Sequence, residues 1–256
     1  MRISNHSWVF ASVHLLVIFL FSCLSAIGQD KEPAEKLTEA DLAFCAKNDL
    51  TRYAKASEKW KAEATKLSRG NASEGSPDAI LCLGSSSFRL WNTIGDDLAP
   101  YKMLRRAYGG AKYCDLAIHS PQLIHGLDYK AVLIFVGNDI TGSELDKTPE
   151  EIVRLSSIVI STIRSHKPNV PIFLVAVTPT PSRFKHWSRI QQANRSLETM
   201  AKSQSNVFFV RTEDKYLTDK NEPRPELFGK DMLHQNADGY KLWASIIRKS
   251  LDANLK

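Results

Sequence analysis

The chain has 256 residues, 43% of them hydrophobic and 24% charged, which is an ordinary composition for a globular protein. The formal net charge of +6 is modest, and basic residues are interleaved with acidic ones, so no nucleic-acid partner is predicted. Once an export segment is set aside, the remaining length suffices for one α/β domain with a full core.

Residues 1–28 have the layout of a secretory signal peptide. Arg2 lies in a short polar head, residues 8–20 are mostly apolar, and small residues follow up to Gly28. The apolar run is too short, and too closely followed by polar residues, to favour a membrane span. We therefore expect cleavage after Gly28 and export to the periplasm or the cell exterior. Lipoprotein-type processing at Cys23, which would provide a lipid anchor, is the main alternative, and an uncleaved anchor is the other.

The segment 29–77 is predicted to be an N-terminal helical arm followed by a linker. It is rich in Ala, Glu, Lys and Leu, which favour helix, and Thr38 with Asp41 is typical of a helix start. Apolar residues recur at three- and four-residue steps over 53–67, which indicates an amphipathic helix. Gly, Ser and Pro dominate 70–77, which predicts a turn-rich linker.

From residue 78 onward, short apolar runs alternate with helical stretches. The expected strands are 79–83, 103–108 (the weakest), 131–136, 171–177 and 206–210, and the expected helices include 149–166, 187–203 and 237–251. Apolar runs without strict alternation, separated by helices, indicate a parallel sheet covered on both faces. We therefore predict an α/β fold, a three-layer, flavodoxin-like, doubly wound parallel sheet of about five strands, over residues 78–256.

The residues that could carry chemistry follow the predicted strands or precede the last helix. Ligands bind at the carboxyl ends of strands in such a sheet. Ser86 follows the first strand, Gly110 the second and Asn138 the third, while Asp231 and His234 precede the final helix. Each alone is typical of a turn or a helix cap. Together and in this order they match a nucleophile, an oxyanion site and a base.

The residue types fit acyl transfer. A serine hydroxyl needs a neighbouring base to be nucleophilic at neutral pH, and His234 could be that base. A carboxylate such as Asp231 would fix the imidazole tautomer and steady the imidazolium. The backbone N–H groups of Ser86 and Gly110, with the side-chain amide of Asn138, could donate to the oxyanion of a tetrahedral intermediate.

Four segments resemble the conserved blocks of the SGNH hydrolase superfamily, also called GDSL-like esterases and lipases. They are 80–91 (ILCLGSSSFRLW), 106–115 (RAYGGAKYCD), 132–140 (VLIFVGNDI) and 231–240 (DMLHQNADGY), the last being the most specific. The first resembles a bacterial branch akin to the platelet-activating-factor acetylhydrolases, in which GSSS replaces GDS. This resemblance implies that Ser86, Asp231 and His234 are catalytic, and that Gly110 and Asn138 belong to the oxyanion hole.

The sequence departs from the family pattern in three places. The third block usually reads Gly-x-Asn-Asp, whereas Gly137 directly precedes Asn138 here, as if one residue were missing. Ala107 stands where glycine is frequent, and Ser85 stands where aspartate is more frequent. None of these departures removes a catalytic group.

The resemblance implies an exported serine esterase that hydrolyses carboxylic esters through an acyl-serine intermediate. The expected substrates are short acyl or acetyl esters, on small molecules or carbohydrates. The alternatives are a lysophospholipase or acyl-thioesterase, and a non-catalytic envelope-binding module on the same fold.

We expect neither a metal nor a cofactor. The sequence has no HExxH or CxxC spacing, no GxGxxG and no P-loop lysine. His119 and His125 are predicted to be surface or supporting residues rather than ligands. His186 and Trp187 follow the fourth strand and are candidates for substrate contact at the rim of the site.

Overall fold

The computed structural model describes residues 36–255. The predicted signal peptide, including Cys23, lies outside the described residues. All described residues fall within the unit that spans Pro33–Lys256. The elements, in chain order, are α1 (Glu39–Lys47), α2 (Thr51–Ser57), the 3-10 helix η1 (Glu58–Trp60), α3 (Lys61–Ser68), α4 (Asn71–Glu74), β1 (Ala79–Gly84), α5 (Ser86–Leu90), α6 (Ile94–Asp97), β2 (Lys102–Ala107), α7 (Tyr113–Ile124), β3 (Ala131–Phe135), α8 (Pro149–His166), β4 (Ile172–Val175), η2 (Pro181–His186), α9 (Trp187–Lys202), β5 (Val207–Val210), η3 (Glu213–Tyr216), η4 (Pro225–Leu227) and α10 (Ala237–Asn254).

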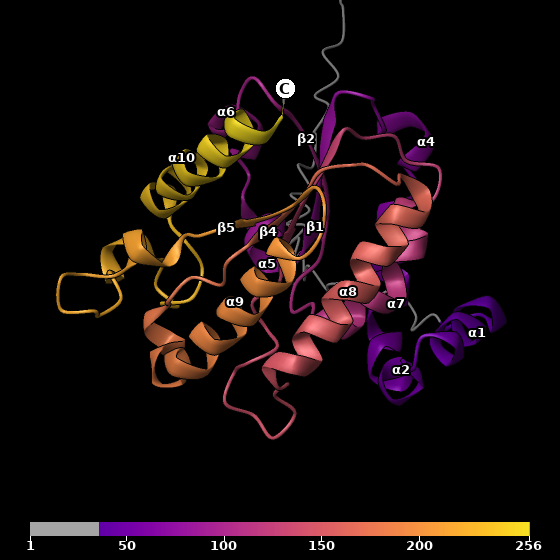
Figure 1. The fold of residues 1–256 in the computed structure, drawn as a ribbon, viewed down its shortest axis with the longest axis horizontal. Coiled ribbons are helices and arrows are strands. Elements are labelled where there is room, and N and C mark those ends of the chain that lie inside the picture. Colours follow the sequence, from indigo (N-terminus) through magenta and orange to yellow (C-terminus); the bar gives the residue numbers. More distant parts are fainter. Residues whose placement is uncertain (1–35, 256) are drawn as a thin grey trace, which may run out of the picture. The chain divides into compact units, whose positions relative to one another are not determined.

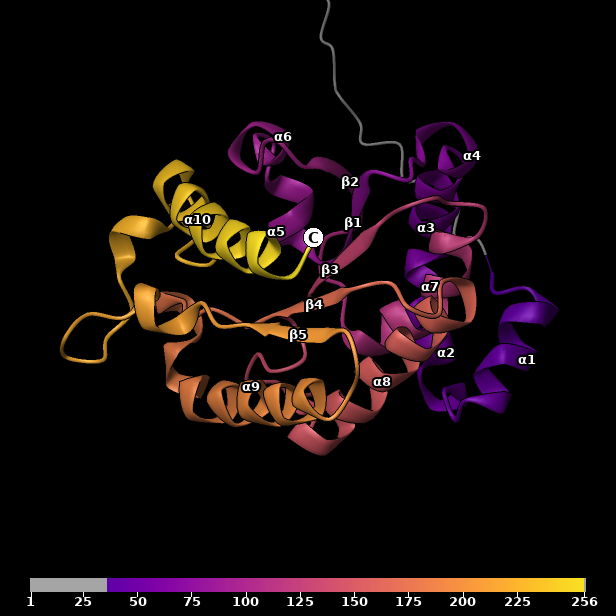
Figure 2. The same ribbon diagram turned by 45° about the horizontal axis from the view of Figure 1, so that its top comes forward.

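The sheet has five parallel strands in the order β2-β1-β3-β4-β5, which confirms the predicted doubly wound fold. Helices cover both faces: α5, α6 and α10 lie on one side, and α7, α8 and α9 on the other (Figure 2). The register brings Gly84 at the end of β1 opposite Ala107 of β2 and Phe135 of β3. The segments that follow these three strands therefore start side by side at one edge of the sheet.

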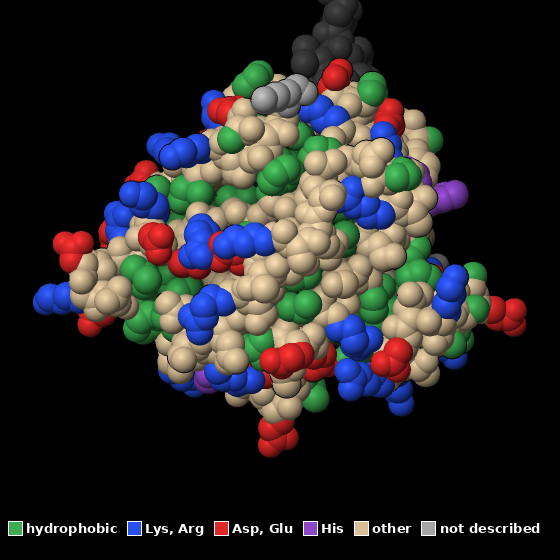
Figure 3. Space-filling model, viewed as in Figure 1, with side chains coloured by type: hydrophobic (Ala, Val, Ile, Leu, Met, Phe, Trp, Pro, Cys, Tyr) green, Lys and Arg blue, Asp and Glu red, His purple; other side chains and the backbone are tan. Residues whose placement is uncertain are grey.

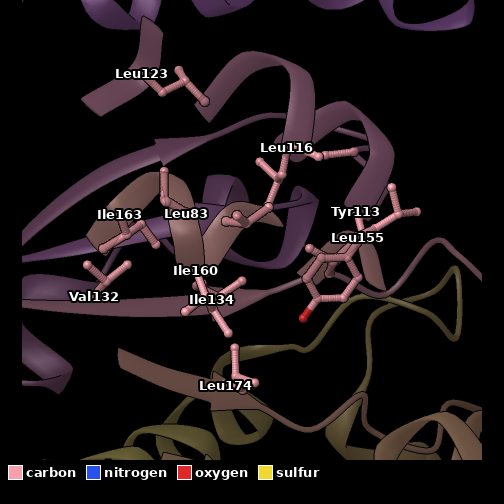
Figure 4. Close-up of a cluster of buried hydrophobic side chains, with 14 of the residues drawn as sticks. Leu83, Tyr113, Leu116, Leu123, Val132, Ile134, Leu155, Ile160, Ile163 and Leu174 are labelled. Carbon is pink, nitrogen blue, oxygen red and sulfur yellow. The ribbon is translucent and has the colours of Figure 1, made fainter. Parts of the chain in front are cut away.

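Each strand contributes to two hydrophobic cores because successive side chains point to opposite faces. In β3, Val132 and Ile134 face the core under α7 and α8, whereas Leu133 and Phe135 face the core under α10. Figure 4 shows part of the first core, with strand residues meeting helix residues between the layers. The labelled side chains are Leu83, Tyr113, Leu116, Leu123, Val132, Ile134, Leu155, Ile160, Ile163 and Leu174. Burial on both faces explains why these strands lack a polar alternation in the sequence.

The N-terminal arm packs against α7, with α1 and α2 extending from that side of the sheet (Figure 1). The predicted start is confirmed: the Thr38 hydroxyl accepts from the N–H of Asp41, and the Asp41 carboxylate accepts from the N–H of Thr38, forming a capping box. The predicted amphipathic helix is instead divided, because η1 separates α2 from α3. Residues 70–77, predicted as a linker, contain α4.

Asn71 explains why this segment is ordered. Its side chain is buried, donates to the carbonyl oxygens of Leu123 and His125, and accepts from Nε of Arg106 at 2.8 Å. These bonds attach the segment to the end of α7 and to β2. A turn-rich composition did not indicate such contacts.

The surface carries mixed charge, as the composition predicts. On the face shown in Figure 3, Lys and Arg side chains are interspersed with Asp and Glu. Within residues 36–255, no helix combines the length and the apolar character needed to cross a membrane.

Candidate active site

Ser86 is the first residue of α5 and follows β1 and Ser85 directly. Because β1 lies between β2 and β3, the chain leaves it in one direction and later returns past it in the other. In doubly wound sheets a crevice opens at this point, outside the carboxyl ends of the strands. A Cβ atom at Gly84 would overlap the carbonyl oxygen of Phe135, so glycine allows β1 and β3 to approach closely just before Ser86.

A tight turn brings Asp231 and His234 to Ser86. The N–H of Gly229 donates to the carbonyl of His234 at 2.8 Å, and Met232 adopts a left-handed backbone with φ of 54°. His234 Nδ1 lies 2.6 Å from Asp231 Oδ2, and His234 Nε2 lies 2.8 Å from Ser86 Oγ. The structure therefore joins these three residues in one hydrogen-bonded series, although Ser86 is far from the others in the sequence.

Asp231 is held in its ionised form. Burial by itself raises its pKa, but hydrogen bonds from the His234 side chain and from the backbone N–H groups of His234 and Leu233 outweigh that effect and lower the pKa to about 2. An ionised carboxylate only accepts hydrogen bonds, so Nδ1 of His234 must carry the proton. In the neutral imidazole, Nε2 is then free to accept the hydroxyl hydrogen of Ser86.

Asn138 follows β3 and reaches the loop after β2. Its Nδ2 donates to the carbonyl oxygen of Ala111 at 3.0 Å, and the next residue, Asp139, accepts from the N–H of Tyr113 at 3.1 Å. Two neighbouring side chains thus connect the loop after β3, which lines the hollow at Ser86, to the loop after β2, whose Gly110 is not among the residues that line it. An amide nitrogen carries two hydrogens, so one N–H of Asn138 remains beyond its bond to Ala111.

Asp139 is itself buried, and its carboxylate lies 3.8 Å from the ammonium group of Lys147. Burial raises the pKa of Asp139 to about 7, against the opposing effects of the Lys147 charge and the Tyr113 hydrogen bond. The carboxyl group therefore gains a proton more readily in the folded protein than in water. It supports the loop after β2 rather than facing Ser86.

Gly110 lies in the loop after β2 with φ of 76°, a conformation that favours glycine. An added Cβ would lie 3.2 Å from Cζ2 of Trp60, in the N-terminal arm. Trp60 also packs against Tyr108, with ring centroids 5.3 Å apart. The arm therefore supports the segment that leads from β2 to Gly110.

Arg183, in η2, is a site residue that the sequence did not reveal. Its guanidinium donates to the carbonyl oxygen of Gly137 and, at 2.9 Å, to Oδ1 of Asn138. The preceding residue, Ser182, donates its backbone N–H to the carbonyl of Met232 at 3.0 Å. No local signal separates Arg183 from an exposed cation, because η2 also contains the exposed Lys185.

The other candidate residues from the sequence, three histidines and Trp187, do not join the site. Trp187 is buried in the hydrophobic core, and neither it nor His186 lines the hollow at Ser86. Of the two predicted positions, surface or supporting, His119 has the second: it is buried, with its Nε2 3.0 Å from the carbonyl oxygen of Ser57. His125 is exposed.

The hollow at Ser86 is small and has both polar and apolar walls. Its volume is about 20 Å³, and Thr178, Thr180 and Leu233 line it together with the residues described above. A second cavity of about 20 Å³ shares part of its wall with the first and is lined mainly by apolar side chains, together with Asp139. Gly137, Val177 and Ile190 line both cavities and form the wall between them.

In the described part of the chain, no three His, Cys, Asp or Glu side chains converge as metal ligands would. The thiols of Cys45, Cys82 and Cys114 are free and buried.

Comparisons with known proteins agree with this architecture. The family model described as the GDSL-like Lipase/Acylhydrolase family matches residues 73–242. No curated protein matches the sequence. A candidate platelet activating factor from Streptococcus pneumonia is similar in structure, with a TM-score of 0.65 and 18% identity, over 84% of this chain and 100% of the other. A candidate acylhydrolase from Bacteroides fragilis has a TM-score of 0.65 and 20% identity, over 77% and 99%. A GDSL-like lipase from Bacteroides thetaiotaomicron has a TM-score of 0.60 and 20% identity, over 81% and 99%.

Proposed function

Because the chain belongs to the GDSL-like lipase/acylhydrolase family and is therefore an ester-bond hydrolase, we propose that it cleaves carboxylic esters through an acyl-Ser86 intermediate. The observation that carries this proposal is the hydrogen-bonded series from Asp231 through His234 to Ser86, with distances of 2.6 and 2.8 Å. As Ser86 Oγ forms a bond to the acyl carbon, its proton passes to Nε2 of His234. Asp231 stabilises the imidazolium that results.

In the remaining steps His234 alternately donates and accepts the proton. The tetrahedral intermediate expels the alcohol, which takes the proton from Nε2 of His234 and leaves the acyl group on Ser86. A water molecule then attacks the acyl carbon while His234 accepts its proton. The second tetrahedral intermediate releases the carboxylic acid, and the proton returns to Ser86 Oγ.

The oxyanion in both intermediates needs hydrogen-bond donors. We assign this role to the backbone N–H groups of Ser86 and Gly110 and to the side-chain amide of Asn138. The second N–H of Asn138, which its bond to Ala111 leaves over, supports this assignment. Preorganised donors of this kind each contribute about 10²–10³ in rate.

The size of the hollow supports a short acyl group. The hollow is small, with a volume of about 20 Å³, which favours a short acyl group such as acetyl over a long chain. Thr178 and Thr180 add hydroxyl groups, which suit a polar alcohol such as a carbohydrate. We therefore propose acetyl or other short acyl esters, on small molecules or carbohydrates, as the substrates.

The neighbouring apolar cavity favours a second candidate, a lysophospholipase or acyl-thioesterase that takes longer acyl groups. A shift of Val177 or Ile190 would join the two cavities into one acyl channel. A panel of chromogenic esters from acetyl to palmitoyl, measured alongside acetylated sugars, separates the two. Highest kcat/KM on acetyl esters supports the first candidate, whereas a rise with chain length supports the second.

Ser86→Ala tests the nucleophile and also the non-catalytic alternative. We expect this variant to keep its fold and lose esterase activity, and a fluorophosphonate probe to label Ser86 in the parent protein. Labelling at Ser85 or Ser87 would contradict the assignment. A parent protein that hydrolyses no ester of the panel and resists the probe would favour an envelope-binding module.

We also propose that the enzyme is exported and that residues 1–28 are removed as a signal peptide. Mass spectrometry of the exported product gives its first residue. A start at residue 29 supports simple cleavage, a lipidated start at Cys23 supports an anchored enzyme, and a product that retains residues 8–20 would contradict both.

A further inference from the structure

Arg183 contacts the loop after β3 and belongs to a segment tied to the turn that carries His234. Its guanidinium binds the carbonyl oxygen of Gly137 and Oδ1 of Asn138, both in the loop after β3. Its neighbour Ser182 is bonded to the backbone of Met232, in the turn that carries His234. Arg183 is also partly buried and lines the hollow at Ser86.

The Asn138 amide has two contacts, Arg183 and the carbonyl of Ala111, and their chemistry determines how the amide is oriented. Arginine has only donors, so the Asn138 atom that faces it must be the oxygen. The carbonyl of Ala111 has only acceptors, so the atom that faces it must be the nitrogen. A flip of the amide would bring donor against donor at Arg183 and acceptor against acceptor at Ala111. The same flip would present oxygen, rather than N–H, to a developing oxyanion.

We propose that Arg183 is a positioning residue that holds the Asn138 amide with its N–H directed toward the oxyanion. The proposal rests on the proposed function, since it assumes that Asn138 is a donor in the reaction. Arg183 acts through Asn138 and forms no bond to the reacting atoms.

The shortened third block explains why such a residue is needed here. Gly137 directly precedes Asn138, so the loop has one residue fewer than the family pattern to direct the asparagine. Arg183 binds both residues at once, because a planar guanidinium can donate two roughly parallel hydrogen bonds. A lysine ammonium, which is a point charge on a flexible stem, cannot reproduce this fork.

A double-mutant cycle tests the proposal. We expect Arg183→Met to lower kcat by about 10- to 100-fold, less than the about 100- to 1,000-fold expected for Asn138→Ala, with little change in KM. In the Asn138→Ala background, Arg183→Met should lower kcat no further, because its only route to the reaction is gone. Arg195→Met is the matched control: Arg195 is exposed on α9, and we expect no change in kcat.

A chemical rescue adds a measurement that loss of folding cannot imitate. Millimolar guanidinium should restore part of the kcat of Arg183→Ala and should have no effect on the Arg183→Ala/Asn138→Ala double variant. Melting temperatures of all variants show which of them are folded at the assay temperature.

Three outcomes would overturn the proposal: additive losses in the cycle, a raised KM with unchanged kcat, and guanidinium rescue that persists without Asn138. The second would assign Arg183 to substrate binding instead. These outcomes differ from failure of the proposed function, which would appear as full activity in Ser86→Ala.

Discussion

Replacing Gly110 by alanine is the sharpest test of the proposed oxyanion site. The backbone φ of 76° at Gly110 costs an L-residue about 1–2 kcal/mol, and the new methyl group would lie 3.2 Å from Cζ2 of Trp60. Either effect would shift the Gly110 N–H, the proposed oxyanion donor. Loss of one such donor lowers kcat by about 10²–10³, or about 2.7–4 kcal/mol of transition-state stabilisation.

Two quantities are measured for each variant: kcat for a soluble aryl acetate, and the free energy of unfolding in urea. Gly126→Ala is the matched control, because Gly126 has a φ of 68° but nothing lies within 4 Å of its added Cβ. Both variants should lose similar stability from the backbone, whereas only Gly110→Ala should lose kcat. Trp60→Phe removes the ring atoms that meet the new methyl, so the Trp60→Phe/Gly110→Ala double variant should recover part of the kcat that Gly110→Ala loses.

Two results would refute this reasoning. Normal kcat in Gly110→Ala would show that its N–H is not an oxyanion donor. An equal loss of kcat in the Gly126→Ala control would show that the loss follows general destabilisation rather than the site.

Three further predictions rest on the pKa shifts of two aspartates and on the two cavities. The pKa of Asp231 is lowered to about 2 from an ordinary 3.8, so its stabilising contribution is complete above pH 3.8 and is lost as the pH falls through 2. Asp231→Asn should therefore reduce the loss of unfolding free energy at acid pH, measured by urea denaturation. An unchanged pH dependence would contradict this prediction. The pKa of Asp139 is raised to about 7, so the folded state binds the proton more tightly than the unfolded state does. The free energy of unfolding should therefore fall as the pH rises from 3.8 to 7, and Asp139→Asn should flatten this dependence. A slope of opposite sign in the parent protein would refute the assignment. Ile190→Ala should join the two cavities and raise the ratio of butyryl to acetyl kcat/KM, at a cost of about 2–5 kcal/mol in stability, and an unchanged ratio would show that the second cavity accepts no acyl group.

The sheet could be predicted from the sequence because its strands are buried on both faces. Residues 79–83 and 131–136 form uninterrupted apolar runs, and the observed β1 and β3 differ from them by one residue at one end. The weakest prediction, 103–108, also corresponds to a strand, β2. Its exposed and partly buried residues at the sheet edge account for the weaker signal.

The N-terminal arm was predicted less well, since periodicity does not show where a helix breaks. The apolar spacing over 53–67 continues through η1, so the division between α2 and α3 left no mark on the pattern. Asn71 in α4 is an example of the same limit. Its buried hydrogen bonds depend on Leu123 and Arg106, which the chain brings close only after folding.

The candidate site likewise contains residues that the sequence predicts and one that it does not. Ser86, Asp231, His234, Gly110 and Asn138 could be named because each stands at a strand end or before the last helix, inside a recognisable motif. Arg183 could not, because its importance depends on partners 45 and 46 residues away. Hydrogen bonds between side chains of distant loops have no sequence periodicity.

Asn138 illustrates why these distant contacts matter for the reaction. Three groups hold its loop: Arg183 on the amide oxygen, Ala111 on the amide nitrogen and Tyr113 on the neighbouring Asp139. An oxyanion donor lowers the barrier most when it is already oriented, because no reorganisation is then needed as the charge develops. Truncating Asn138 would therefore also remove the hydrogen bonds that it makes with Nη2 of Arg183 and with the Ala111 carbonyl, at a cost of about 1–3 kcal/mol in stability. A single side chain thus couples the stability of the loop to the rate of the reaction, and the two effects separate only when kcat is measured far below the melting temperature.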